Sequence, residues 1–282
     1  MALYETIRFY PRPALLKPLI KYFWVFESRG PVALNHTILP VSNIDLIFNL
    51  GAPNVYEKAG KIHPSPADAY FSGLRSKPIT MIQSGRILTL GAAFFPTGFF
   101  PFSGIPVSEF KDKTVSLEDI LPCQTQRLLQ ALHHADRIPA KVKVLEDFFV
   151  SLLEKNRDEK RRVPGDTRCL LNRFGTENTG VRSFCSNHGV HPRTLERMFN
   201  RYVGTSPKGY LRLSRFQSTL NHLLKADQVP LTRLAQDLDF YDQPHFIRDF
   251  KAFTGASPSR FLREKKAIIQ LSRPHLKESV IP

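Results

Sequence analysis

A stretch of 18 residues occurs twice in this sequence, 51 positions apart. The first copy reads LERMFNRYVGTSPKGYLR from Leu195, and the second reads FIRDFKAFTGASPSRFLR from Phe246. Both copies contain a G-x-S-P motif, followed by an aromatic residue and a Leu-Arg pair. Two copies are too few for a solenoid, which needs at least three stacked repeats. The duplication therefore predicts a supersecondary unit that the chain uses twice.

The residues before each copy predict what this unit is. A short apolar helix that contains a small residue, Cys185 or Ala235, precedes a tight turn and a second helix. That order is typical of a helix-turn-helix, in which the small residue lets the helices approach and the turn often contains glycine. Gly189 fits the first turn, whereas the second has Asp239, which adopts left-handed conformations at moderate cost. We therefore expect two helix-turn-helix units.

The second helix of each unit has one apolar and one polar face. Residues at helical spacing form the expected buried stripes: Leu195, Met198, Phe199 and Tyr202 in the first unit, and Phe246, Phe250 and Phe253 in the second. The polar faces consist of Arg193, Thr194, Glu196, Arg197, Asn200 and Arg201 in the first unit, and of Gln243, Pro244, His245, Ile247, Arg248 and Lys251 in the second. Such faces are either ordinary solvated surfaces or DNA-reading surfaces. The excess of arginine favours DNA, because arginine pairs with guanine in the major groove.

These motifs resemble the DNA-binding domain of the AraC/XylS family of transcription regulators. The resemblance rests on the two copies and on the intervening segment GYLRLSRFQSTLNHLL. It implies two helix-turn-helix units joined by a long helix, each inserting a recognition helix into one of two adjacent major-groove segments of double-stranded DNA. The residues implied for base reading are Arg193, Glu196 and Arg197 in the first unit and Gln243, Pro244, Ile247 and Arg248 in the second. The chain departs from the family pattern at His191, Thr219 and Asp239.

Further basic residues are candidates for contacts with DNA phosphates. These are Lys208, Arg212, Arg215 and Arg260, and Arg215 is equally well explained as a structural residue of the linking helix. Pro244 cannot donate a side-chain hydrogen bond to a base. The second unit is therefore expected to read sequence less stringently than the first.

The charge balance supports a polyanionic partner. The chain has 40 Lys and Arg against 25 Asp and Glu, and the part from residue 166 onward has 19 against 10. Basic charge alone fits either nucleic acid or an anionic membrane surface. Three scattered cysteines and the lack of a signal peptide or a long apolar run indicate a cytoplasmic protein with reduced thiols.

The first 120 residues have a different composition. Short apolar runs alternate with turns rich in Pro and Gly, a pattern that predicts the strands of a small barrel or sandwich. The segments ILPVSNIDLIFNLG and FSGLRSKP resemble the sensor half of one branch of AraC-type regulators, which implies a cupin-like β-barrel. Candidate residues for a ligand cavity are Trp24, Phe26, Phe48, Asn49, Phe71, Arg75, Phe94 and Thr97. Core packing is the alternative explanation for the aromatic residues.

The expected fold class is α+β: an N-terminal β-barrel, a helical connector and a C-terminal all-α domain. Residues 1–120 form the sensor domain, 121–156 the connector, 157–166 a linker, 167–268 the DNA-binding domain and 269–282 a tail. The apolar stripe in the connector packs on its own domain or forms a dimer seam.

The predicted function is a sequence-specific DNA-binding transcription regulator. A small-molecule effector or homodimerisation through the N-terminal domain is expected to modulate it, with RNA polymerase as a partner. We expect no cofactor, metal or catalytic site, because His36 and His63 lack ligand partners and no nucleophile motif occurs. The alternatives are a DNA-tethered barrel enzyme and a non-specific DNA-organising protein.

Overall fold

A computed structural model describes residues 4–58, 61–65, 67–155, 162–177, 179–225 and 242–263. The N-terminal half contains the strands β1 (Tyr4–Phe9), β2 (Ile20–Ser28), β3 (Val32–Ile38), β4 (Ile44–Asn49), β5 (Asn54–Lys58), β6 (Lys61–Pro64), β7 (Ala69–Ser72), β8 (Ile79–Gly85), β9 (Leu88–Phe94) and β10 (Thr114–Ser116). The strands form one six-stranded sheet in the order β1-β2-β9-β4-β7-β10 and one four-stranded sheet in the order β3-β8-β5-β6. The predicted barrel is therefore two separate antiparallel sheets rather than one closed cylinder.

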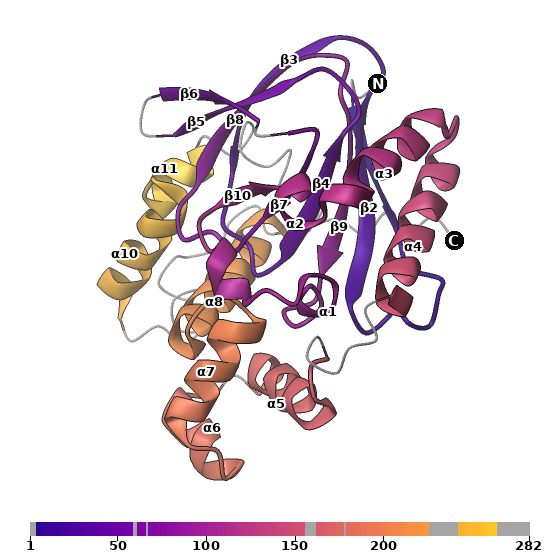
Figure 1. Cartoon of the computed structure of the whole chain (residues 1–282). Coiled ribbons are helices and arrows are strands. Elements are labelled where there is room, and N and C mark those ends of the chain that lie inside the picture. The colour runs from indigo at the N-terminus through magenta and orange to yellow at the C-terminus, as the bar shows by residue number, and fades with distance from the viewer. Residues whose placement is uncertain are drawn as a thin grey trace.

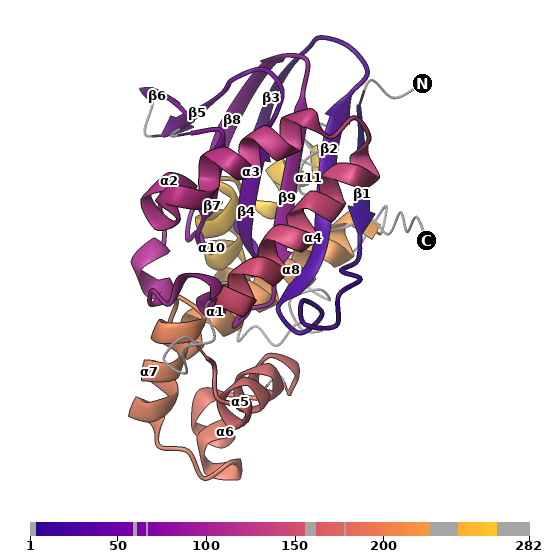
Figure 2. The ribbon, with the colours of Figure 1, turned by 45° about the vertical axis from the view of Figure 1, so that its right-hand side comes forward.

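Both faces of the six-stranded sheet are covered. One face packs against helices α1 (Phe100–Ser103), α3 (Pro122–His134) and α4 (Ile138–Lys155), of which α3 and α4 lie across the sheet in Figure 2. Phe149 of α4 lies 6.1 Å from Phe23 and 5.6 Å from Phe94 between ring centroids. The apolar stripe of α4 is thus buried within its own domain. The other face of the sheet is turned toward the four-stranded sheet.

The C-terminal half is helical. Its helices are α5 (Gly165–Thr176), α6 (Val181–Asn187), α7 (Pro192–Tyr202), α8 (Pro207–Lys225), α10 (Gln243–Thr254) and α11 (Pro258–Arg263). The predicted α+β class, with a sheet-rich N-terminal part and a helical C-terminal part, is confirmed. Ala235 in the first helix of the second predicted unit, Asp239 in its turn, and the tail from residue 269 lie outside the described residues.

Helices α6 and α7 form the first predicted unit. Phe174 of α5 packs on Phe184 of α6 at 4.9 Å and on Phe199 of α7 at 4.8 Å, so the three helices share one aromatic core. Gly189 lies between α6 and α7 with φ of 61°, a left-handed conformation that costs glycine little. The expected turn glycine therefore occupies the position where its freedom is needed.

The duplicated G-x-S-P motif ends one helix and begins the next. Gly204 and Gly255 follow α7 and α10 with φ of 91° and 76°, the left-handed conformation that terminates helices. Ser206 then accepts a hydrogen bond from the N–H of Gly209 at 3.1 Å, as an N-cap does. Pro207 and Pro258 are the first residues of α8 and α11, where the missing proline N–H costs nothing. The motif is repeated because the same helix junction is built twice.

Helix α8 connects the two units. Tyr210, near its start, packs on Phe199 of α7 at 5.6 Å between centroids. Phe216, further along α8, packs on Phe250 at 5.7 Å and on Phe253 at 4.8 Å, both from α10. One continuous helix, labelled α8 in Figure 1, thus contacts both α7 and α10.

The two halves of the chain are in direct contact. The 3-10 helix η1 (Val107–Phe110) packs against α7, and Phe100 meets Tyr202 edge-on at 4.9 Å. A second contact involves Ser42, whose N–H lies 3.3 Å from Oε1 of Gln217 on α8 and whose hydroxyl donates to the same oxygen. The strand-rich half therefore touches both the first recognition helix and the helix that joins the units.

Candidate nucleic-acid interface and ligand cavity

Helix α7 presents a basic surface. Arg193, Arg197 and Arg201 recur every fourth residue, and all three side chains are exposed, as is Glu196. Thr194 and Asn200, which were also predicted to face DNA, are half-buried. The exposed face of this helix thus places three positive charges along one line.

A histidine caps the start of α7. Nδ1 of His191 accepts a hydrogen bond from the N–H of Arg193 at 3.2 Å. The departure from the family pattern at this position therefore preserves the helix start, because the imidazole satisfies an N–H that has no partner within the helix.

Helix α10 presents a less basic surface. Asp242 caps the helix by accepting a hydrogen bond from the N–H of His245 at 2.6 Å. The exposed residues on this helix are Gln243, Pro244, Ile247, Arg248, Lys251 and Ala252. His245 is half-buried, and its Nε2 lies 3.6 Å from Oδ2 of Asp249. The His245 side chain therefore lies against its own helix, near Asp249, and is only partly exposed to solvent.

Arg212, one of the predicted phosphate contacts, is bound within the protein. Its Nε and Nη2 donate to the two carboxylate oxygens of Asp249 at 3.2 and 2.7 Å. Those hydrogen bonds raise the pKa of the Arg212 guanidinium. Arg215 is half-buried on the same helix, and its carbonyl accepts from the hydroxyl of Thr219 at 2.9 Å.

An open groove separates α7 from the N-terminal half. Its walls are formed by Pro106 and Ser108 on one side and by Arg193, Glu196, Arg197, Asn200 and Arg201 on the other. The Arg201 guanidinium also stacks over the ring of Phe100, 5.2 Å from its centroid. The predicted DNA-reading face of α7 therefore borders a loop of the N-terminal half.

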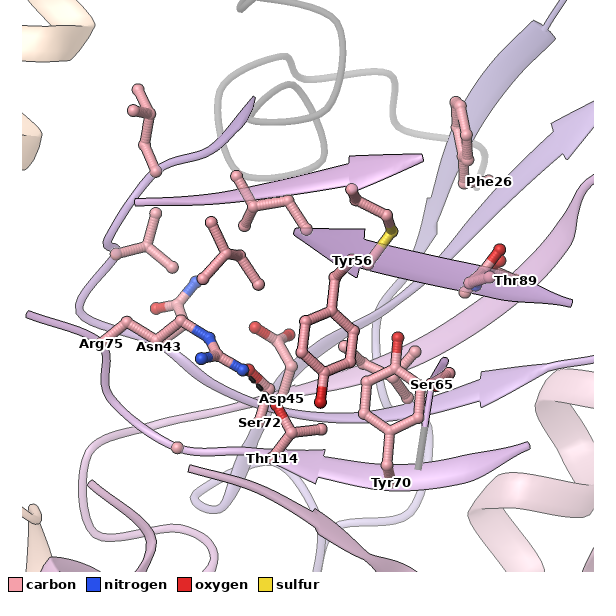
Figure 3. Close-up of a pocket in the computed structure, with 18 of the residues that line it drawn as sticks. Phe26, Asn43, Asp45, Tyr56, Ser65, Tyr70, Ser72, Arg75, Thr89 and Thr114 are labelled. Carbon is pink, nitrogen blue, oxygen red and sulfur yellow. Dashed lines mark hydrogen bonds between the residues drawn. The ribbon is translucent and has the colours of Figure 1, made fainter. Parts of the chain in front are cut away.

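A cavity lies between the two sheets. It encloses about 1100 Å³ of space not filled by atoms, including its opening to solvent. Its apolar wall includes Trp24, Phe26, Ile47 and Met81, and its polar wall includes Asn43, Asp45, Asn54, Tyr56, Tyr70, Arg75, Gln83, Thr89 and Thr114. Figure 3 shows Asp45 and Tyr70 of the six-stranded sheet and Tyr56 of the four-stranded sheet converging on the cavity. Its mixed apolar and polar lining is typical of a small-molecule site.

The predicted cavity residues fall on both faces of the six-stranded sheet. Trp24, Phe26 and Arg75 line the cavity. Phe48, Phe71 and Phe94 lie in the main hydrophobic core instead. Asn49 donates from Nδ2 to the carbonyl of Ala52 at 2.9 Å, and Thr97 is buried. Alternation places neighbours on opposite faces, so Asp45 and Ile47 reach the cavity while Leu46 and Phe48 do not.

Sequence reasoning missed the carboxyl group of Asp45. This side chain is buried, and Trp24 donates its indole N–H to it at 3.0 Å. Burial raises the pKa of Asp45 to about 7, although the Trp24 hydrogen bond and the charge of Lys21 oppose the shift. The signal in the sequence was a single acid inside the apolar strand IDLIFN.

Arg75 brings a positive charge to the cavity. It comes from the loop between β7 and β8, and its Nη2 donates to the hydroxyl of Thr114. Burial lowers the pKa of the guanidinium, and the neighbouring Tyr70, Asp112 and Tyr56 oppose this shift. Arginine nevertheless stays protonated in proteins, so the cavity contains a cation.

Metal sites and membrane-spanning helices were also predicted to be absent. No group of three or more His, Cys, Asp and Glu within them is arranged to hold a metal ion. None of the described helices is long and apolar enough to cross a membrane. Cys185 is buried in α6, whereas Cys123 and Cys169 are exposed.

The pairing of α6 and α7 around a left-handed glycine defines a helix-turn-helix domain. Residues 184–264 match a family described as a helix-turn-helix domain, and residues 7–116 match one described as a domain of unknown function (DUF6597).

Named relatives specify the type of this domain. The probable thc operon regulatory protein of Rhodococcus erythropolis is 31% identical over 38% of this chain and 33% of its own length. The arabinose operon regulatory protein of Escherichia coli is 26% identical over 43% of this chain and 42% of its own. The matched segments thus span less than half of either relative. The C-terminal part of the chain is a DNA-binding domain of the AraC/XylS type, which confirms the predicted family.

One solved structure resembles the whole chain more distantly. ToxT from Vibrio cholerae O395 is 9% identical, with a TM-score of 0.44 over 94% of this chain and 99% of that one.

Proposed function

We propose that this protein is a sequence-specific DNA-binding transcription regulator. The observation that carries the proposal is the pair of recognition helices, α7 and α10, held on one helix, α8, with polar faces exposed. Arg193 and Arg197 of α7 and Arg248 of α10 are the proposed base readers, because arginine pairs bidentately with guanine. Two readers in one chain recognise two successive major-groove segments when they are spaced by one DNA turn, about 34 Å.

The remaining polar residues of the two faces have a supporting role in this proposal. Exposed Arg201 and Lys251 would neutralise phosphates, which position the protein without selecting a sequence. Pro244 and Ile247 would give the second unit mainly apolar contacts, such as a thymine methyl group. The second unit would therefore select bases less strongly than the first.

The N-terminal half is proposed to regulate DNA binding. Two features support this: a cavity between the sheets, and the contact of η1 with α7 next to the DNA-reading face. A small effector in the cavity would change the position of the DNA-binding half, because Asn43 lines the cavity and the adjacent Ser42 is hydrogen-bonded to Gln217 of α8. RNA polymerase and a second copy of the chain are further proposed partners.

We propose no catalytic activity and no cofactor for this chain. The function requires only binding, and the family to which the C-terminal domain belongs regulates transcription. A DNA-tethered enzyme and a non-specific DNA-organising protein remain distinct alternatives, each with its own outcome in the following experiment.

The test is a selection of random duplex DNA on the full-length protein at fixed salt. We expect two enriched sequence boxes about one helical turn apart. Arg197→Ala should remove enrichment of one box, and Arg248→Ala should remove enrichment of the other, each costing about 1–3 kcal/mol. Arg127→Ala, which removes an exposed charge on α3, is the matched control and should leave both boxes unchanged.

Enrichment of no sequence, with affinity that depends only on salt, would reject sequence-specific regulation and favour the DNA-organising alternative. Chemical conversion of the bound DNA or of a small molecule would favour the enzyme. If Arg127→Ala also lost both boxes, the effects of Arg197→Ala and Arg248→Ala would reflect the loss of positive charge and not the loss of base contacts.

A further inference from the structure

Arg75, at one end of the cavity, is influenced by the charge of Asp112 but does not form an ion pair with it. The guanidinium donates to the hydroxyl of Thr114, and among the described residues no Asp or Glu forms an ion pair with it. A half-buried guanidinium has five N–H donors in a planar fork that matches a carboxylate. Figure 3 shows the Arg75 side chain pointing toward Thr114, Ser72 and Asp45 at one end of the cavity. This end is therefore suited to an anion from outside the protein.

The opposite end presents a neutral hydrogen-bonding pair. Nε2 of Gln83 donates to Oδ1 of Asn54 at 2.8 Å. The remaining Nδ2 of Asn54 and Oε1 of Gln83 have no hydrogen-bond partner among the described residues. Whichever way the two amides are oriented, one N–H group and one carbonyl remain available.

These unpartnered groups are deeply buried. Asn54 is 3% and Gln83 2% exposed, and the hydroxyl of Thr89, at 5% exposure, also lacks a partner among the described residues. A buried polar group without a hydrogen bond destabilises the fold. A ligand that supplied the missing partners would relieve this destabilisation.

The two polar ends lie apart along the sheets. Arg75 precedes β8, whereas Gln83 is four residues beyond Ile79 at the start of that strand, about 14 Å at the usual strand rise. Thr89, near the start of β9, lies beside Phe26 in Figure 3, away from Arg75. The remaining lining includes the apolar residues Trp24, Ile47 and Met81, and Figure 3 shows the phenols Tyr56 and Tyr70 between the two ends.

We propose that the cavity binds a small amphipathic carboxylate, whose carboxylate pairs with Arg75 and whose far end carries a hydroxyl or amide group for the Asn54–Gln83 pair. This inference deepens the regulatory part of the proposed function, because it specifies the chemical class of the effector. The apolar body of the ligand would replace water against Trp24 and Met81.

Asp45 opposes this ligand class only weakly. Its buried carboxyl holds a proton more tightly than an exposed one, so it opposes an anion less than a fully ionised acid would. Its Oδ1 accepts from Trp24, whereas the acids and phenols that influence Arg75 are Tyr70, Asp112 and Tyr56. Arg75 and Asp45 therefore have different immediate partners.

The test is calorimetric titration of the full-length protein without DNA. The probes are 3-(4-hydroxyphenyl)propanoate, its amide and 3-phenylpropanoate, with homologues that have one to four methylene groups. The hydroxy acid of the best-fitting length should bind at least about ten-fold more tightly than its amide, the range measured for loss of a buried charge pair. It should also bind a few-fold more tightly than the acid that lacks the hydroxyl, because one hydrogen bond is lost.

Two variants test the two polar ends of the cavity independently. Arg75→Met should abolish the preference for the acid over the amide. Gln83→Leu should abolish the preference for the hydroxyl and retain that for the acid. Arg86→Met, which removes an arginine whose side chain is 72% exposed, is the control and should bind as the original protein does. Thermal unfolding without ligand checks that each variant is folded.

Equal affinity for the acid and the amide, or no binding by any acid in the series, would overturn the proposal. Tighter binding of 4-hydroxyphenethylamine than of the acid would assign the site to a cation paired with Asp45 and would also overturn it. The titration contains no DNA, so a negative result would reject the ligand class and not the proposed DNA recognition. A negative result in the DNA selection would likewise leave the ligand class untouched.

Discussion

Arg212 of α8 and Asp249 of α10 form a bidentate ion pair between these two helices, with N–O distances of 3.2 and 2.7 Å. The side chain of Asp249 is 9% exposed and that of Arg212 is 41% exposed, so water screens the pair on one side only. Arg212 also stacks over Phe253, 5.5 Å from the ring centroid. The pair fixes α10 to the helix that also carries α7.

Removing one partner of this pair should loosen the second unit. Asp249→Ala is expected to lower the free energy of unfolding by about 1–3 kcal/mol, because it removes two charge-assisted hydrogen bonds at a mostly buried carboxylate. Chemical denaturation followed by circular dichroism measures the change. Asp147→Ala on α4 breaks a pair with Lys143 whose side chains are both 61% exposed, and it should change stability by less than about 0.5 kcal/mol. If Asp249→Ala and Asp147→Ala lowered the free energy of unfolding equally, the Arg212–Asp249 pair would have no special structural role.

Replacing each of the three left-handed glycines of the helical half with alanine should lower the free energy of unfolding by a different amount. Gly189→Ala and Gly255→Ala have open space around the added methyl group, so only the backbone strain remains, about 1 kcal/mol. At Gly204 the added Cβ would lie 2.8 Å from a methyl carbon of Val107 and 3.0 Å from the Val107 carbonyl. Gly204→Ala should therefore destabilise the protein more than the other two, by about 2–4 kcal/mol.

The comparison of the three variants also tests the contact between the halves. Denaturation of the three proteins under one set of conditions gives the order of stability. If Gly204→Ala costs no more than Gly189→Ala, then η1 does not press on the end of α7 in solution.

Much of the helical half could be predicted because its signals are local. A glycine, a serine and a proline at fixed spacing determine how one helix ends and the next begins, and the sequence repeats this spacing at both junctions. The contact of Val107 with Gly204 could not be predicted, because it joins residues far apart in the sequence and no local pattern records it.

The cavity was harder to predict for a different reason. Both faces of the six-stranded sheet are buried, one by helices and one by the second sheet, so its strands lack the polar alternation that identifies the inner face. Phe48 and Phe71 were predicted to line the cavity together with Trp24, but the first two point toward the helices. The polar residues Asp45 and Gln83 mark the cavity face more clearly than the aromatic residues do.

A negative charge at Ser108 should compete with DNA. Ser108 lines the groove beside Arg193 and Arg197 and is half-buried, so a carboxylate there would attract the arginines that are proposed to read bases. Ser108→Glu should weaken binding to the selected DNA several-fold and reduce the salt dependence by about one phosphate contact. Gln130→Glu adds the same charge on an exposed position of α3 and should have little effect. Unchanged affinity and salt slope in Ser108→Glu would place DNA away from this groove.

The buried carboxyl of Asp45 should make the stability of the strand-rich half fall as pH rises. Its pKa is raised by burial to about 7, above its ordinary value of 3.8, so the folded state holds the proton more tightly than the unfolded state. The stabilisation is present below about pH 4 and is lost progressively up to about pH 7, with a total of up to about 4 kcal/mol. Asp45→Asn keeps an oxygen for the indole of Trp24 but cannot ionise. It should match the original protein near pH 4 and exceed its unfolding free energy at pH 8, whereas Asp147→Asn should show no such divergence. Parallel stability curves for the original protein and Asp45→Asn between pH 4 and 8 would show that this carboxyl ionises normally in the fold.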